Sequence, residues 1–183
     1  MKKILILFLM VSLIFTAIAA EKIAFEQPIL ITSGGQSPGA LQMKVLAKAS
    51  KLDYVFEKTI SAADFDSGNY KTLIVVIGAS GKGLGAAGID IDAEVARVES
   101  LCQKAKEDGV KVALFQIEGG SRRGTSTDLI IDTLAPYADA VFFKLDGNED
   151  GKFTQLEADY PIYFESFEKT SNVKSILKDN FAN

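Results

Sequence analysis

The sequence predicts a single α/β domain on a doubly wound, mostly parallel sheet of five or six strands, in a flavodoxin-like or Rossmann-like three-layer sandwich. Short apolar runs alternate with amphipathic helical patterns along the chain. The strongest runs are apolar at nearly every position, as strands covered on both faces must be. Each of the four strongest runs is followed by a glycine-bearing loop.

The first expected strand is PILIT, residues 28–32, which ends at Ser33-Gly34-Gly35. Pro38 then opens a helical pattern that runs to about Ser50, since proline is favoured in the first turn. The next helix is capped by Asp90 or Asp92 and stops at Gly109. The remaining expected strands are residues 54–60, 72–77, 111–117, 140–144 and 162–165, and the remaining helices are residues 129–137, 154–159 and 173–181.

Composition removes several classes of chemistry. The 183 residues contain no His, no Trp and one Cys, which excludes histidine bases, Cys/His zinc sites and an internal disulfide. The cysteine, Cys102, falls on an apolar helical stripe and is expected in the core. With 20 basic against 24 acidic residues, the chain is a poor partner for nucleic acid.

The first twenty residues are typical of an export signal. Lys2 and Lys3 precede an apolar run over residues 4–15, and small residues follow around Ala19 and Ala20. The run is shorter than the roughly 20 residues that span a bilayer. We therefore expect a signal peptide at residues 1–20 and a single α/β domain at residues 21–183, periplasmic or extracellular, with no stable membrane insertion. An uncleaved membrane anchor is the alternative.

The glycine loops should share one edge of a parallel sheet, where open α/β proteins bind ligands. Their cations and hydroxyls favour a small anionic ligand, because guanidinium groups clamp carboxylates and phosphates. The alternative is that these glycines only form tight turns, and that the arginines cap a helix or pair with Asp90, Asp92 or Glu118. The candidate ligand-binding residues are Ser33, Gly34, Gly35, Gln36, Ser37, Ser80, Lys82, Gly83, Arg122 and Arg123.

Two nucleotide motifs nearly match. Residues 83–88 fit G-x-G-x-x-G, but the preceding strand ends about five residues too early for a dinucleotide site. Gly81-Lys82 is followed by Gly83 instead of Ser or Thr, so it is not a phosphate loop.

The segment from Asp146 to Glu157 fits the calcium-loop pattern D-x-[DN]-x-[DN]-G-x5-E. Its candidate ligands are Asp146, Asn148, Asp150, Lys152 and Glu157. A strand stands before the loop where a calcium hand has a helix. Thr154 and Glu157 also form a capping box that would begin the next helix without metal. Calcium and a turn with a helix cap are therefore both open.

Four stretches, ITSGGQSPGAL, GASGKGLGAAGIDID, GGSRRGTSTDLI and GNEDGKFT, together resemble the signature stretches of the bacterial family domain of unknown function 6305. The resemblance covers nearly all of the chain after the signal. It implies the α/β fold and export, and it carries no established activity.

Three functions follow as hypotheses. The first is a module that binds a small anionic molecule above the strand tips. The second is a hydrolase or transferase with Ser33 or Ser80 as nucleophile and Lys82 as base, or with Asp90 or Asp92 as general acid or base. No serine here stands in a G-x-S-x-G elbow. The third is a protein-interaction module that uses the same loops with a partner that the sequence does not identify.

Overall fold

The structure is a computed structural model, and it describes residues 23–181. The predicted signal peptide therefore lies outside the described residues. Within them, six parallel strands form one sheet in the order β2-β1-β3-β4-β5-β6. The strands are β1 (Ile29–Gly34), β2 (Tyr54–Phe56), β3 (Thr72–Ile77), β4 (Lys111–Gln116), β5 (Ala140–Lys144) and β6 (Tyr163–Phe167).

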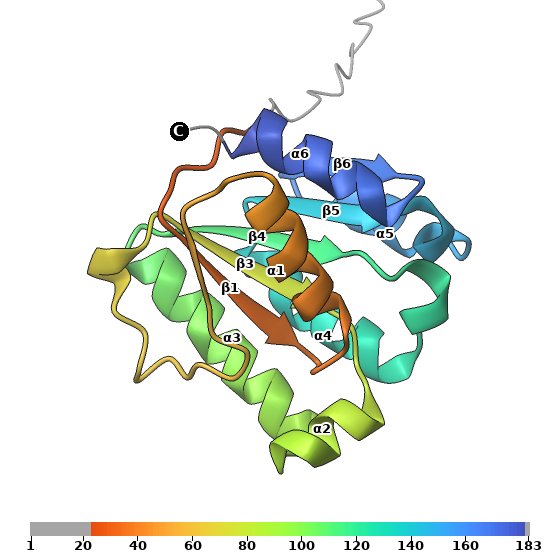
Figure 1. The fold of residues 1–183 in the computed structure, drawn as a ribbon. Helices are drawn as coiled ribbons and strands as arrows, with labels where there is room; N and C mark the ends of the chain where they lie inside the picture. The colour runs from red at the N-terminus through yellow and green to blue at the C-terminus, as the bar shows by residue number, and fades with distance from the viewer. Residues whose placement is uncertain (1–22, 182–183) are drawn as a thin grey trace, which may run out of the picture.

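Helices cover both faces of this sheet, as continuously apolar strands require (Figure 1). Helices α1 (Gly39–Ala49) and α6 (Val173–Asn180) pack on one face. Helices α3 (Ile91–Glu107), α4 (Thr125–Leu134) and α5 (Lys152–Asp159) pack on the other. The short helix α2 (Gly81–Ala87) follows β3 at the carboxyl edge. The predicted doubly wound α/β class is confirmed, and the sheet is wholly parallel.

Alternate residues of each strand supply the two cores. Leu73 and Val75 of β3 face α3 and α4, while Ile74 and Val76 face α1 and α6. Cys102 packs fully buried in the first core, as expected, and this burial raises the pKa of its thiol to about 12. No helix among residues 23–181 is long and apolar enough to span a membrane.

The strand order places a topological switch point between β1 and β3. The chain moves from β1 outward to β2, returns to β3 on the other side of β1, and then continues in one direction to β6. This is the flavodoxin-like order, in which the loops after β1 and β3 diverge and leave a crevice. The switch point therefore lies at the predicted glycine loops.

Several predicted element bounds were wrong. The first strand continues to Gly34, so Ser33 and Gly34 belong to the strand and not to the turn. The second strand stops at Phe56, and α4 begins at Thr125, four residues before the expected start. Helix α2 occupies most of a segment that was expected to be a loop, because Ser80 caps it by accepting a hydrogen bond from the Gly83 N–H at 3.2 Å.

Candidate functional site

The loops after β1 and β3 are held together by backbone hydrogen bonds. The N–H of Gly78 donates to the Gly34 carbonyl at 2.8 Å, and the N–H of Ser80 donates to the Gly35 carbonyl at 2.8 Å. The N–H of Ser37 donates back to the Gly78 carbonyl at 3.1 Å. Gly35 has a φ of +109°, and a Cβ there would lie 2.5 Å from the Gly78 carbonyl oxygen. The two loops thus form one rigid base for a site.

A buried carboxylate on α3 accepts hydrogen bonds from the loop that follows β1 and holds that loop in place. Glu94 is fully buried, and its Oε1 accepts hydrogen bonds from the Gly35 N–H at 2.7 Å and the Gln36 Nε2 at 2.9 Å. Arg97 pairs with Glu94 at 2.8 Å and also donates to the Ser33 carbonyl. These contacts satisfy a charge that would otherwise be costly to bury. Sequence reasoning missed both residues.

Gln36 occupies an uncommon backbone position at the centre of this base. Its φ is +62°, a value that glycine adopts easily and other residues rarely. The residue is 2% exposed, and its N–H donates to Ser33 Oγ at 2.9 Å. Helix α2 packs so closely against it that a Cβ at Gly83 would lie 1.9 Å from the Gln36 carbonyl oxygen.

One open cleft joins the three predicted loops. We call it the switch-point cleft; it has a volume of about 570 Å³. It is lined by Gln36, Ser37, Pro38, Leu41, Lys58, Ser80, Gly81, Lys82, Gly83 and Arg122. Six of the ten candidate residues therefore meet at this cleft, namely Gln36, Ser37, Ser80, Lys82, Gly83 and Arg122.

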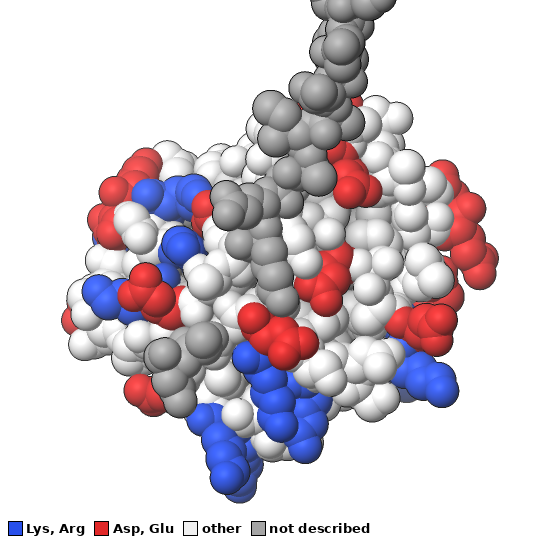
Figure 2. All heavy atoms as spheres, turned by 90° about the horizontal axis from the view of Figure 1, so that it is seen from above, with Lys and Arg blue, Asp and Glu red and all other residues white. Residues whose placement is uncertain are grey.

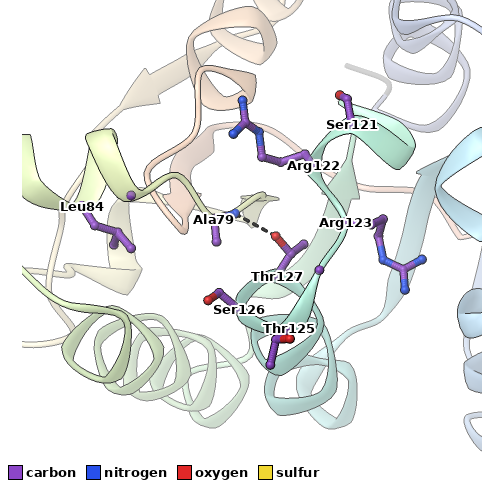
Figure 3. Close-up of a pocket in the computed structure, with 10 residues that line it drawn as sticks. Ala79, Leu84, Ser121, Arg122, Arg123, Thr125, Ser126 and Thr127 are labelled. Atoms are coloured by element: carbon purple, nitrogen blue, oxygen red, sulfur yellow. Dashed lines mark hydrogen bonds between the residues drawn. The ribbon is translucent and has the colours of Figure 1, made fainter.

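A second hollow of about 430 Å³ adjoins the first, and the two share Gly81 and Arg122. Its floor includes the first turn of α4, where Thr127 Oγ1 accepts a hydrogen bond from the Ala79 N–H at 3.0 Å (Figure 3). Figure 3 shows the side chains of Arg122 and Arg123 pointing in opposite directions. Arg122 lines both hollows, whereas Arg123 lines only the second one, and its guanidinium lies over the Phe153 ring of α5, 5.6 Å from the ring centroid.

The two arginines consequently have different partners. Arg122 Nε donates to Glu118 Oε1 at 3.2 Å. Arg123 pairs with Asp128 at 2.7 Å and Asp150 at 2.8 Å, and it also donates to the Gly147 carbonyl. These hydrogen bonds raise the pKa of Arg123 and lower the pKa of Asp150. The pairing with Glu118, which was the alternative to ligand contact, is found for Arg122, whereas Arg123 pairs with two other carboxylates and lines the second hollow only.

Glu118 is placed beside the cleft by two glycines. A Cβ at Gly39 would lie 2.8 Å from Glu118 Oε2, and a Cβ at Gly78 would lie 2.9 Å from the same atom. This oxygen is buried and has no hydrogen-bond partner among residues 23–181. Glu118 therefore contacts Arg122 through Oε1 only, and no hydrogen bond from the two terminal guanidinium nitrogens is found in the described part of the chain.

The cleft also contains two lysines without an ion-pair partner among the described residues. Lys82 is exposed on α2, and Lys58 follows β2 and is half-buried. Sequence reasoning missed Lys58, because β2 was expected to continue to residue 60 and its end was therefore misplaced. A shorter strand would have put Lys58 at the same edge as the other loops.

The hydroxyls of both serines proposed as nucleophiles accept hydrogen bonds from backbone N–H groups. Ser33 is fully buried and accepts from the Gln36 N–H, while Ser80 caps α2. No hydrogen bond in the described region joins either hydroxyl to Lys82 or to a carboxylate. Asp90 caps α3 by accepting from the Ala93 N–H at 2.8 Å, and Asp92 lies exposed in the first turn.

The predicted calcium ligands do not converge. Asp146 Oδ2 pairs with Lys144 at 2.7 Å, Asp150 pairs with Arg123, and Lys152 pairs with Asp132. Asn148 Oδ1 accepts from the N–H groups of Phe153 at 2.7 Å and Thr154 at 3.3 Å, and Glu157 lies exposed on α5. In the described region no group of three or more acidic, cysteine or histidine side chains is placed to hold a metal ion.

The predicted capping box at this helix was also wrong. Helix α5 begins at Lys152, two residues before Thr154, and Asn148 supplies the oxygen that accepts from its first turn. The chain turns back at Gly151, whose φ is +76°, and this turn brings the Asn148 side chain to the first turn of α5.

Charge on the molecular surface is mixed. Figure 2 shows one face of the molecule, on which acidic side chains are spread widely and basic side chains lie mainly toward the lower and left margins. That view presents no continuous basic surface of the kind that tracks a phosphate backbone.

These features define a parallel, flavodoxin-like α/β protein with an open cleft at its switch point. The chain belongs to the family described as a domain of unknown function, DUF6305, whose model matches residues 26–181. No curated protein matches the sequence.

Two solved structures similar to this chain are esterases. A psychrotrophic esterase EstA from Pseudoalteromonas sp. is 13% identical, with 83% of this chain and 92% of that one covered and a TM-score of 0.34. A family two carbohydrate esterase from Clostridium thermocellum is 9% identical, with 87% and 62% covered and a TM-score of 0.39. Similarity at this level says nothing about the activity of this protein.

Proposed function

We propose that the protein binds a small anionic molecule in the switch-point cleft. The observation that carries this proposal is that Lys58, Lys82 and Arg122 line one cleft of about 570 Å³. That volume lies within the range of small-molecule sites, roughly 300–1,000 Å³. Three cations at one cleft on a chain of net charge −4 favour an anion over a neutral or cationic ligand.

Each cleft residue has a distinct part in this proposal. Arg122 is oriented by Glu118 through Nε, which leaves its two terminal nitrogens to donate in parallel to a carboxylate or phosphate. Ser37 forms part of the cleft wall but is only 1% exposed, and its Oγ accepts from the Gly39 N–H at 3.3 Å, so it shapes the cleft and is not counted among the ligand donors. Lys58 and Lys82 line the same cleft and supply further positive charge there. The ligand is held by cations that follow three different strands, β2, β3 and β4, and that line the same cleft.

The test compares anions on matched variants. Thermal unfolding and calorimetric titration with inorganic phosphate, ethyl phosphate and acetate would be run on wild type, Lys82→Gln, Arg122→Gln and Lys71→Gln. Lys71 is an exposed lysine at the opposite edge of the sheet, so its variant matches the loss of charge. We expect the two cleft variants to lose about tenfold in affinity each, and Lys71→Gln to bind as wild type does.

Two results would contradict the proposal: no binding of any of these anions, or an equal loss in Lys71→Gln. Arg123→Gln is a further control, because its guanidinium is already shared by Asp128 and Asp150. It should lower stability and leave anion affinity unchanged. We also propose that binding takes place outside the cytoplasm, on the basis of the signal pattern in residues 1–20.

A further inference from the structure

An apolar stripe leads away from the switch-point cleft along α1. Leu41 lines the cleft and is nevertheless 51% exposed, and Val45, one turn further, is 66% exposed. Pro38 lines the cleft directly before the helix. Residues three and four apart share one face of a helix, so these three side chains form a continuous track. At 1.5 Å per residue the track is about 10 Å long.

The inner face of α1 explains why this track is unusual. Ala40, Met43 and Ala47 already bury that face against β1 and β3. Leu41 and Val45 therefore add nothing to the core, and a solvent-facing turn ordinarily carries polar residues. They are two of the five large apolar side chains that are exposed among the described residues, and Leu41 lines the same cleft as the three cations.

Resting on the proposed function, we infer that the anion is amphiphilic: an acidic head bound by Lys58, Lys82 and Arg122, and an aliphatic chain laid along Pro38, Leu41 and Val45. Leu41 belongs both to the cleft and to the apolar track, so a single ligand can contact the two at once. A phosphate or a carboxylate head meets the same cations, and the test separates the two.

The experiment titrates the protein by calorimetry with two pairs of anions, octyl phosphate with ethyl phosphate and octanoate with acetate, and with the neutral octyl glucoside, all kept below their micelle concentrations. The variants are Leu41→Ser and Leu129→Ser. Leu129 is a matched control, because it is 44% exposed on α4 and lines neither hollow. We expect octyl phosphate or octanoate to bind about tenfold more tightly than its short-chain counterpart. Leu41→Ser should remove that gain, and Leu129→Ser should keep it.

The outcomes separate the two proposals. Equal affinity within both pairs, octyl against ethyl phosphate and octanoate against acetate, overturns the amphiphilic ligand and leaves anion binding intact. Failure of every anion overturns both. Octyl glucoside binding as tightly as octyl phosphate overturns the inference, since the head group would then contribute nothing. A concentration-dependent dimer that Leu41→Ser abolishes, without any ligand effect, overturns it in favour of a contact between copies of this chain.

Discussion

Glu94 Oε1 accepts a hydrogen bond from the Gly35 N–H at 2.7 Å, across 59 positions of sequence. A carboxylate in the first turn of α3 thus fixes the loop that follows β1. Because Arg97 neutralises the same carboxylate at 2.8 Å, the charge is retained in a fully buried position. The shape of the switch-point cleft therefore depends on a residue that does not line it.

Replacing Glu94 should damage the fold more than the loss of one surface charge does. Glu94→Gln leaves Arg97 without its ion pair at a site where the arginine side chain is only 12% exposed. We expect a loss of about 3 kcal/mol in the free energy of unfolding, measured by urea denaturation. Glu107→Gln, exposed near the end of the same helix, should cost about 0.5 kcal/mol or less. Similar losses in the two variants would show that the buried pair is not important.

Gly83 and Gly85 lie two residues apart on α2 and should respond oppositely to alanine. A Cβ at Gly83 would lie 1.9 Å from the Gln36 carbonyl oxygen, and one at Gly85 would meet nothing within 4 Å. Gly83→Ala should cost about 2 kcal/mol, since backbone must move. Gly85→Ala should stabilise by about 0.5 kcal/mol through helix propensity. Urea denaturation of both variants checks the sign of each, and two stabilising changes would contradict the close packing of α2 on the β1 loop.

The ion pair between Arg123 and Asp150 should make stability depend on pH in the acid range. The hydrogen bond from Arg123 lowers the pKa of Asp150 in the folded state. Its contribution is therefore present above the unfolded value of about 4 and is lost as pH falls through the folded pKa. The difference in melting temperature between wild type and Asp150→Asn should be small, because solvent screens the pair, and should shrink below about pH 4. A difference that grows with acid would contradict this.

Calcium should not stabilise the protein through the loop from Asp146 to Glu157. Lys144, Arg123 and the first turn of α5 already use the oxygens of Asp146, Asp150 and Asn148. We expect the melting temperature to be unchanged at millimolar Ca²⁺, with Mg²⁺ as the control ion. A rise that is specific to Ca²⁺ and is removed by Asp146→Asn would restore the calcium interpretation.

The fold was predictable because a sheet covered by helices on both faces needs strands that are apolar at every position. Runs such as TLIVVI show this pattern within a few residues. The meeting of Ser37, Lys82 and Arg122 at one cleft followed from the shared edge of parallel strands. The partners of individual charges were not predictable, because they come from contacts between distant segments. Arg122 and Arg123 are neighbours in sequence, yet they point to opposite sides of their loop.

One signal for the missed residues was present. Glu94 falls on the apolar stripe of α3 that contains Val98, Leu101 and Ala105, and all four side chains are buried. A charge on a core-facing stripe with an arginine three residues later indicates a buried ion pair. Helix α2 had no comparable signal, since three of its seven residues are glycine and its stability comes from the Ser80 cap and from packing on Gln36.

The most direct test of the switch-point cleft is a phosphate titration of isotopically labelled protein followed by backbone amide NMR. We expect saturable shifts grouped at Gln36, Ser37, Lys82 and Arg122, on loops that lie far apart in sequence and line one cleft. Amides at Lys71 and along the end of α3 should not move. Shifts that are scattered over exposed lysines, or none at all, would contradict a single anion site at this edge of the sheet.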